Sequence, residues 1–417
     1  MACPTMRTLV LDNGSNSIKV GWADSQKCLH VQNAMMRSRD RRLWLGNTVD
    51  FCKDLTGLQY RRPIDRGQLY SWELEKAIWD WTWDTKEIVE SVDTFKESAL
   101  LLTETPGSLP SASTNTDQII FEEYEFAKYR RVLPQVLAAN ATAPSSQGKM
   151  VIDLGFGATH AVPVLDRVNA SANGTIRLGV AGKLLTNYLK ETVSFRHYNM
   201  MEETAIMGRI KEQTCFTSLD FAADLVNWHE SNLQRSYSKF ALGYALPSTH
   251  EFPYGRVIEP LETALQAQKS GDEQVLVLEN ERFSIPEALF DPKGHVGLDQ
   301  AGVAELVAQS IHASPLDYQP LLWSNVIVAG GTANLPNFVE RFTSELRKWA
   351  PSDIPLRVST NPSGTSEETA WQGGKNLVND DTFDMEGFLV SREEYFEQGP
   401  AHVARKFASS NKWRAPN

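Results

Sequence analysis

The sequence predicts an α/β protein made of two similar halves, and three glycine turns carry this prediction. Each turn ends a short run of β-branched and aliphatic residues, in the stretches RTLVLDNG, GKMVIDLG and SNVIVAGG. Such runs are typical of buried parallel strands. The first two turns share an aspartate and a glycine, and Asp12 and Asp153 lie 141 positions apart (153 − 12). Two such turns indicate a duplicated domain.

Length and composition fit this architecture. The chain of 417 residues exceeds what one hydrophobic core usually supports, so we expect at least two domains. Its hydrophobic content of 41% is ordinary for a globular protein and allows a large core. No run approaches the roughly 20 apolar residues of a membrane span, and the opening stretch lacks the features of a signal peptide, so we expect no membrane segment.

Charge and cysteine usage exclude further classes. A net charge of −11 argues against nucleic-acid binding by the whole surface, because phosphate contacts need clustered positive charge. The basic segment RSRDRR at 37–42, followed by Tyr60, Arg61 and Arg62, is either a solvated loop or a docking site for an acidic partner. The cysteines form no CxxC pair, which argues against a disulfide framework and a zinc site. They are Cys3, Cys28, Cys52 and Cys215.

Two helices follow from apolar spacing. The stretch SWELEKAIWDWTW at 71–83 predicts a helix capped by Ser71, and its tryptophans share one face, which favours a core stripe. A second helix is expected to start near Asn334 and Pro336. Its regularly spaced apolar residues are Phe338, Val339, Phe342, Leu346 and Trp349, with the cations Arg347 and Lys348 in the last turn. Breaks are expected at 105–116, at 139–149 and within 246–274, and we interpret the second as the boundary between the halves.

The two aspartate turns have the composition of phosphate-binding loops. A phosphate needs converging backbone N–H donors, and only small residues let the backbone approach that closely. These donors come from Gly14, Ser15, Asn16 and Ser17 in the first turn and from Gly155, Gly157 and Ala158 in the second. Lys19 adds a positive charge, and Asp12 and Asp153 could hold a hydrated Mg²⁺. One such turn is usually only a turn, but the pair, together with GGT at 330–332, favours a nucleotide cleft.

At these residues the chain resembles actin and the actin-related proteins. LVLDNGSNSIKVGWA and VIDLGFGATHAVPV are similar to the two phosphate loops of that family, and VIVAGGTANLPNFVERF is similar to its adenosine segment. The further stretches NERFSIPEALFDP, AWQGGK and VSREEYFEQGP follow in the family's order. The resemblance implies the actin fold, in which two duplicated ribonuclease-H-like domains with inserted subdomains enclose a nucleotide cleft.

The resemblance also implies domain bounds and a binding site. The first domain would comprise 1–147 plus 369–417, with a small inserted subdomain at about 33–68, and the second 148–368, with an insertion at about 179–284. The ligand would be ATP or ADP with Mg²⁺, the metal held through water by Asp12 and Asp153. The implied nucleotide-binding residues are Asp12, Gly14, Ser15, Asn16, Lys19, Asp153, Gly155, Phe156, Gly157, Gly182, Lys211, Glu212, Gly330, Gly331 and Thr332.

Three departures from the family pattern bear on activity. In a helix predicted over FEEYEFAKYRRVLPQVLAA, Pro134 aligns with the glutamine that positions the attacking water in actins, with Gln135 one place away; the proline would kink that helix. Phe156 replaces an acidic residue near the water, and Glu367 a lysine near the adenine. We therefore expect no catalytic residue and no enzymatic activity, with the nucleotide as a structural ligand. Thr159 and His160 could instead orient a water, although a buried histidine more often only satisfies its neighbours.

Two differences in length bear on assembly. Between MMRSRD and LWLGN the chain has only two residues, Arg41 and Arg42, where actin carries a longer loop that inserts into the next filament subunit. Filament formation is therefore not expected. The stretch from Tyr244 to Asn280 spans 36 positions (280 − 244) and is longer than in actin, which predicts an extra surface element at 245–279.

Within the family, several stretches resemble a nuclear branch that serves in SWR-type chromatin remodellers. They are NAMMRSRDRRLWLGN, TGLQYRRPIDRGQLYSWELEKAIWDW, GKLLTNYLKE and NDDTFDMEGFLVSREEY. This implies a noncatalytic subunit that scaffolds exchange of a variant H2A histone into nucleosomes, and so contributes to transcription regulation. The implied partners are an insert of the motor subunit, a zinc-HIT subunit and RuvB-like ATPases, close to nucleosomal DNA. The implied location is the nucleus, with a cytoplasmic pool. An ATP-hydrolysing enzyme, a sugar kinase and a cytoskeletal filament protein stay open as alternatives.

Overall fold

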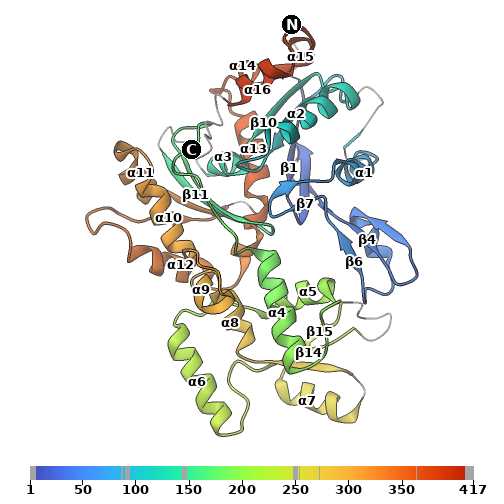
Figure 1. The fold of residues 1–417 in the computed structure, drawn as a ribbon, viewed down its shortest axis with the longest axis vertical. Coiled ribbons are helices and arrows are strands. Elements are labelled where there is room, and N and C mark those ends of the chain that lie inside the picture. The colour runs from blue at the N-terminus through green and yellow to red at the C-terminus, as the bar shows by residue number, and fades with distance from the viewer. Residues whose placement is uncertain are drawn as a thin grey trace.

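A computed structural model describes residues 6–85, 88–89, 94–142, 148–247, 252, 254–271, 273–362 and 364–408. Figure 1 shows two α/β units that meet at a central helix pair. The first is built on a six-stranded sheet of order β19-β10-β9-β1-β2-β3 and the second on a five-stranded sheet of order β13-β12-β11-β17-β18. Both sheets confirm the α/β prediction.

The two sheets start in the same way, as a duplication predicts. In the first, β1 pairs with β2 in an antiparallel hairpin and with β9 in parallel. In the second, β11 pairs with β12 in an antiparallel hairpin and with β17 in parallel. The strands of the first sheet are β1 (Thr8–Asn13), β2 (Ser17–Trp22), β3 (Leu29–Gln32), β9 (Ala99–Thr103), β10 (Lys128–Val132) and β19 (Val390–Ser391). Those of the second are β11 (Lys149–Leu154), β12 (Thr159–Val164), β13 (Ile176–Leu178), β17 (Val326–Ala329) and β18 (Val358–Ser359).

Two helices join the sheets. Helices α3 (Pro134–Ala139) and α13 (Thr369–Val378) share a buried cluster with Val10 of the first sheet and Val151 of the second. Because one apolar cluster takes side chains from both sheets, the two units are held in contact beneath the glycine turns. The predicted boundary at residue 147 lies outside the described residues, and the domain bounds stay a prediction.

Two small sheets lie at the outer ends of the units. One has the order β5-β4-β6 and the other β15-β14-β16; Figure 1 places β4 and β6 at the right and β14 at the bottom. Their strands are β4 (Met35–Arg37), β5 (Leu43–Leu45), β6 (Gln59–Arg61), β14 (Leu242–Ala245), β15 (Arg256–Ile258) and β16 (Val275–Leu278). The predicted extra element at 245–279 corresponds to β15, helix α7 (Leu261–Ser270) and β16, and Ala264 of α7 packs on the sheet.

The remaining elements cover the sheets. The helices are α1 (Trp72–Trp83), α2 (Pro110–Gln118), α4 (Gly182–Arg196), α5 (Thr204–Thr214), α6 (Phe221–Leu233), α7 (Leu261–Ser270), α8 (Glu281–Glu287), α9 (Pro292–Val296), α10 (Val303–His312), α11 (Gln319–Ser324), α12 (Phe338–Arg347), α14 (Met385–Phe388), α15 (Arg392–Gln398) and α16 (Pro400–Ala408). A two-stranded hairpin comprises β7 (Ile64–Asp65) and β8 (Gln68–Leu69). Within the described parts of the chain, no helix has both the length and the apolar character needed to cross a membrane.

The tryptophan stripe of α1 is confirmed as core. Trp79 and Trp83 are buried, and the ring of Trp79 makes edge contacts with Trp72 and Trp83 at 5.7 and 6.0 Å between centroids. Ser71 is the N-cap residue by its backbone, but its side chain makes no capping hydrogen bond. The stripe therefore fixes α1 through packing.

The predicted long helix around Pro134 is wrong. Residues 128–132 form β10, and Pro134 is the first residue of α3. Proline lacks an N–H and costs little at the first helical position, and it keeps the preceding Leu133 extended (φ −65°, ψ 134°). The proline therefore starts a helix here and kinks none.

Several predicted boundaries also move. Helix α2 begins at Pro110 inside the expected break at 105–116, and α7 lies inside the break at 246–274. Part of the break at 139–149, residues 143–147, lies outside the described chain. Helix α12 begins only at Phe338, because Asn337 has a positive φ of 65° that no continuous helix permits. Trp349 follows the end of α12 and is 48% exposed.

The contact between α3 and α13 gives a stability prediction. A Cβ atom at Gly373 would lie 1.7 Å from the carbonyl oxygen of Leu137, so Gly373→Ala must push the helices apart. Overpacking of this kind costs on the order of 1–3 kcal/mol or more, which urea unfolding would measure. Gly208→Ala on α5 is the matched control, because a Cβ there meets nothing within 4 Å. The control is expected to stabilise by roughly 0.5–1 kcal/mol; equal effects at both positions would contradict the prediction.

Candidate functional site

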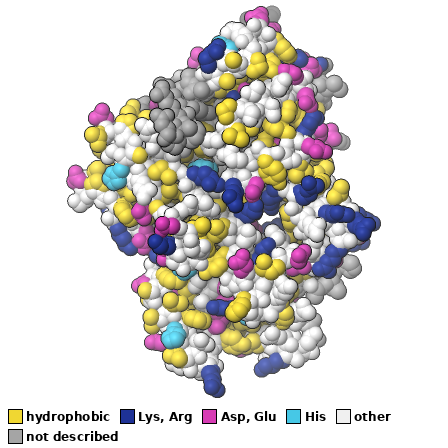
Figure 2. Space-filling view, in the orientation of Figure 1, with side chains coloured by type: hydrophobic (Ala, Val, Ile, Leu, Met, Phe, Trp, Pro, Cys, Tyr) yellow, Lys and Arg dark blue, Asp and Glu magenta, His cyan; other side chains and the backbone are white. Residues whose placement is uncertain are grey.

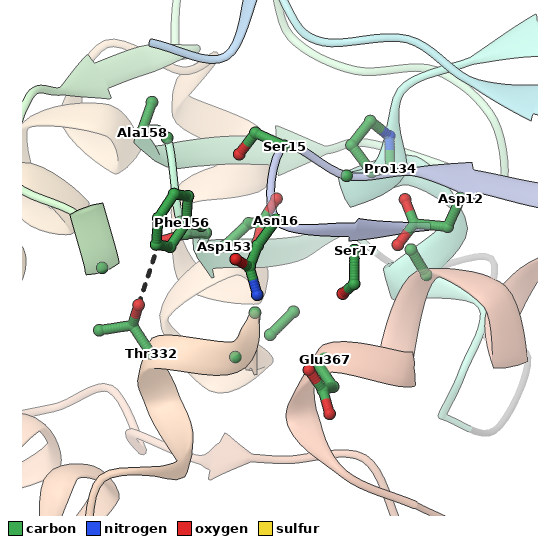
Figure 3. A pocket seen from close by; sticks show the side chains of 18 of the residues that line it. Asp12, Ser15, Asn16, Ser17, Pro134, Asp153, Phe156, Ala158, Thr332 and Glu367 are labelled. Atoms are coloured by element: carbon green, nitrogen blue, oxygen red, sulfur yellow. Dashed lines mark hydrogen bonds between the residues drawn. The ribbon is translucent and has the colours of Figure 1, made fainter. Parts of the chain in front are cut away.

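The glycine turns of both sheets open onto one cavity of about 390 Å³ (Figure 3). Every residue predicted from the resemblance to bind nucleotide lines it, from the first turn (Asp12, Gly14, Ser15, Asn16, Lys19), the second (Asp153, Gly155, Phe156, Gly157) and the nucleoside end (Gly182, Lys211, Glu212, Gly330, Gly331, Thr332). Figure 3 shows Asp12, Asp153 and Glu367 around this common space. The fold thus brings the predicted residues together, while their binding role stays a prediction.

The first turn is a rigid hairpin with a charged pair at its base. Asp12 and Lys19 are opposite each other in the β1–β2 register, and Lys19 Nζ lies 3.6 Å from Asp12 Oδ2. The Thr103 hydroxyl donates to Asp12 Oδ1 at 2.9 Å and accepts from the Asn13 N–H at 2.8 Å. Threonine on β9 therefore fixes the carboxylate from the neighbouring strand.

Helix α1 supports the first turn from behind. The Asn33 amide donates to the carbonyl oxygen of Gly14 at 3.1 Å and, more weakly, to Glu75 Oε1 at 3.4 Å. The Trp79 indole N–H donates to Asn13 Oδ1 at 3.3 Å. Glu75 is fully buried, and its Oε2 has no hydrogen-bond partner among the described residues. Burial raises the pKa of the Glu75 carboxyl to about 7.

The second turn presents a carboxyl that is costly to ionise. Burial, and secondly the neighbouring charge of Asp12, raise the pKa of Asp153 to about 6. The Gln135 amide donates to Asp153 Oδ2 at 2.8 Å, while Gln135 Oε1 is buried without a partner among the described residues. The amide that the alignment placed one position away from the family's glutamine therefore does lie in the cavity.

The two turns touch each other, and glycine makes this possible. A Cβ at Gly157 would lie 2.9 Å from both Ser15 Oγ and the backbone nitrogen of Gly67. Gly330 has φ +89°, and a Cβ there would lie 2.4 Å from the carbonyl oxygen of Leu154. Side chains at these positions would separate the loops, so the glycines set the width of the cavity.

The nucleoside end is held by contacts within the second unit. The Thr332 hydroxyl donates to the carbonyl oxygen of Gly155 at 3.0 Å, and the Gly182 N–H donates to the same oxygen at 3.1 Å. Lys211 Nζ donates to the carbonyl of Gly182 at 3.2 Å and to the Thr186 hydroxyl at 3.0 Å. Burial lowers the pKa of Lys211, and its ammonium is already used to hold the start of α4.

Arg62 is a site residue that the sequence did not reveal. Its guanidinium donates to the carbonyl oxygens of Ser15 and Asn16 at 3.4 and 3.1 Å. The same group lies over the rings of Phe156 at 4.7 Å and Tyr60 at 5.1 Å. Arg62 therefore ties together both loops and the small sheet. Sequence reasoning grouped it with the solvated basic segment, because nothing in the RR dipeptide distinguishes the arginine that turns inward.

Segments next to the two outer sheets bridge the two units outside the cavity. Glu203 accepts from the Gly57 N–H at 2.8 Å, and Arg39 lies 3.5 Å from the same carboxylate. The apolar cluster beneath β4, which contains Met36, is joined by Ala205 and Tyr254 from the opposite unit. The cleft is thus closed by both polar and apolar contacts.

His160 is buried, whereas the basic segment at 37–42 lies mostly at the surface. Burial lowers the pKa of His160 to about 3, so the ring is neutral near pH 7, and its Nε2 has no partner in the described chain. A role in orienting water stays a prediction. The basic segment is mostly exposed, and its turn is closed by Ser38 and Arg42. Figure 2 shows Lys and Arg side chains gathered at the right edge, on the side of β4 and β6.

The buried acid behind the first turn gives a pH prediction. The folded state holds a proton on Glu75 up to about pH 7 and the unfolded chain only to about 4.5, so this group's contribution to stability falls as the pH rises between these values. We expect Glu75→Gln to match the parent near pH 4.5 and to exceed its unfolding free energy at pH 8 by on the order of 2 kcal/mol. Exposed Glu73→Gln on the same helix should show no such trend. Urea unfolding across the pH range measures this, and a pH-independent difference would contradict it.

Comparison with known proteins agrees with the geometry. The Actin family model matches residues 3–408. The chain is 39% identical to "Actin-like protein ARP6" of Yarrowia lipolytica, covering 94% of this chain and 95% of the relative. It is 36% identical to "Actin-related protein 6" of Neurospora crassa (97% and 95% covered) and 32% identical to that of Drosophila melanogaster (94% and 97%). The family branch that the sequence resembles is the one named actin-related protein 6; this resemblance is confirmed, and the chain belongs to the actin family.

Proposed function

We propose that this protein is a noncatalytic actin-fold subunit of a SWR-type chromatin remodeller, in which it scaffolds the exchange of a variant H2A histone. Support comes from its similarity to proteins named actin-related protein 6 over nearly the whole chain. In this proposal it works in the nucleus, with a cytoplasmic pool, and binds the motor insert, a zinc-HIT subunit and RuvB-like ATPases close to nucleosomal DNA.

The cavity supports ATP or ADP with Mg²⁺ as its ligand. Asp12 and Asp153 bring two carboxyl groups from opposite loops into the cavity, where burial and, secondly, the charge of Asp12 raise the pKa of Asp153 to about 6. A divalent cation offsets such charge, and Mg²⁺ usually keeps several waters when carboxylates hold it. Lys19 and the N–H groups of both turns supply the donors that phosphates require. The residues present therefore fit the group, and the actin family in general binds nucleotide.

The observation that carries the noncatalytic role is the stack of Arg62 on Phe156. The apolar ring stands where the resemblance places an acidic residue near the attacking water, and the guanidinium over it is bonded to the first loop. These groups bind and hold loops but offer no base for a water. The contacts of Glu203 with Gly57 and Arg39 also favour a structural role, because a ligand held between bridged units would join them.

Gln135 favours the second candidate, an ATP-hydrolysing enzyme. Its amide lies in the cavity, and its unpartnered Oε1 could accept a hydrogen bond from a water. The nitrogen, however, is bonded to Asp153. Hydrolysis would therefore depend on this one side chain, and the two candidates can be separated by changing it.

The short hairpin between β4 and β5 supports the proposal that this protein does not form filaments. The Arg41 N–H donates to the carbonyl of Ser38 at 2.9 Å, which closes a turn of a few residues. Such a turn has no length to insert into a neighbouring subunit. A scaffold in a defined complex needs no such loop.

Nucleotide is expected to stabilise the protein without being turned over. A ligand that binds only the folded state adds roughly 4 kcal/mol at about a thousandfold excess over its Kd, so ATP–Mg²⁺ or ADP–Mg²⁺ should raise the Tm of the full chain. Lys19→Met should abolish most of this shift. Lys348→Met, at the C-cap of α12 with a side chain that is 64% exposed, should keep it.

Phosphate release measured on the same samples should stay at background. Sustained release by the parent chain that disappears in Gln135→Ala would overturn the noncatalytic role in favour of the enzyme. An absent Tm shift with both nucleotides would overturn the structural-ligand part of the proposal.

The assembly can be tested by affinity purification from nuclear extract. We expect a motor ATPase, a zinc-HIT protein and RuvB-like ATPases to be recovered in near-stoichiometric amounts, because a scaffold subunit is bound permanently. The surface variant Lys348→Met, purified in the same way, is the control and should recover the same partners. Recovery of a cytoskeletal set of proteins, with none of these partners, would contradict the proposal.

A further inference from the structure

Three metal-binding side chains from distant parts of the chain meet beside β3. They are Cys28, which just precedes the strand, His30 on the strand, and Glu368 at the N-cap of α13. One ligand atom of each residue lies within 4.8 Å of the others, and His30 Nε2 is 2.8 Å from Glu368 Oε1. Among the described residues, no other three Cys, His, Asp or Glu side chains gather as closely.

The mixture of ligand types selects the metal. Thiolate, imidazole and carboxylate together are a ligand set of Zn²⁺, whereas Mg²⁺ and Ca²⁺ take oxygen ligands. Tetrahedral Zn²⁺ with bonds of about 2.0–2.3 Å places its ligand atoms roughly 3.3–3.7 Å apart. The present separations of the ligand atoms of Cys28, His30 and Glu368 are at most 4.8 Å, with 2.8 Å between His30 Nε2 and Glu368 Oε1, so they lie on both sides of this range or within it.

The surroundings suit a cation. The His30 and Glu368 side chains are 35% and 31% exposed, so an ion can enter from solvent. Cys28 has no disulfide partner, and burial together with the Glu368 carboxylate raises the pKa of its thiol to about 12. A bound metal reverses this effect, because it attracts the thiolate and offsets the neighbouring negative charge.

We propose that Cys28, His30 and Glu368 form a Zn²⁺ site whose fourth ligand is water. The absence of a CxxC pair argued against zinc in the sequence, but here the ligands come from distant parts of the chain. The site would pin the start of α13 to β3. Ser366 and Glu367, directly before Glu368, line the nucleotide cavity. The metal would therefore fix one wall of the cavity from outside, whatever partner proteins the chain has.

Zinc binding to the full-length chain tests the site directly. Protein stripped with a chelator and desalted is titrated with Zn²⁺ by equilibrium dialysis, and we expect one tight equivalent. Loss of an outer partner of a metal ligand weakens binding roughly 10- to 100-fold, and loss of a ligand costs at least as much. Cys28→Ser, His30→Gln and Glu368→Gln should each show this loss.

Two control variants match these changes. Cys52→Ser alters a buried thiol that lies outside the cluster. His402→Gln alters a histidine that pairs with Glu394 at 2.7 Å in the same way, yet belongs to no such cluster. Both controls should bind Zn²⁺ like the parent, and circular dichroism of the metal-free variants shows that each is folded.

Cobalt gives a readout that carboxylates in the cavity cannot produce. Co²⁺ bound at the site should show tetrahedral d–d bands and a thiolate-to-cobalt charge-transfer band, which Cys28→Ser removes and Cys52→Ser keeps. Zn²⁺ should also raise the Tm of the parent and of both controls, but not that of the three ligand variants. Equal Zn²⁺ affinity in parent and Cys28→Ser, or a cobalt spectrum without a sulfur band, would overturn the proposal.

Discussion

The burial of two carboxyl groups, those of Asp12 and Asp153, in one cavity is the constraint around which the centre of the molecule is built. Each aspartate is the next-to-last residue of its strand, β1 or β11, and both residues line the same cavity. Burying like charges is unfavourable unless they are paired or neutralised. Lys19, Thr103 and Gln135 meet part of this requirement. The divalent cation and nucleotide of the proposed function would meet the rest.

The contacts around Asp12 and Asp153 hold the two units together over the cavity. Glycines at 157 and 330 let the loops approach, and Arg62 holds both loops and Tyr60 of the small sheet with one guanidinium. Farther out, Glu203 accepts from the backbone of Gly57, and Tyr254 packs on the opposite apolar cluster. In the proposed function, a ligand inside the cavity would join the two units, which suits a scaffold better than an enzyme with rapid turnover.

The segment before α13 links this centre to the edge of the first sheet. Glu367 faces the cavity, while Glu368, one residue later, reaches His30 on β3. Two consecutive residues thus face two different sites. A metal bound by Glu368 would restrict the position of Glu367 in the cavity wall, because the two residues share one short stretch of backbone.

The sequence by itself determined the strands that run into the glycine turns, the two aspartates and the tryptophan stripe of α1, since these depend on local periodicity and backbone sterics. It did not show that β2 and β12 follow the first two turns as antiparallel partners. It predicted the residues that line the cavity through their order along the chain. It could not show that Pro134 starts a helix, because proline favours either a kink or a first helical turn according to what precedes it. Whether the strand β10 or a helix precedes Pro134 depends on pairing with β9.

Only the tertiary structure decided which polar groups meet. Arg62 turns inward while Arg61 stays exposed, although the two are indistinguishable in the sequence. Gln135 reaches Asp153 because α3 lies between the sheets. His30 and Glu368 are 338 positions apart and meet only because the last part of the chain returns to the first sheet. Such long-range contacts are set by packing of whole elements, and no local pattern along the chain records them.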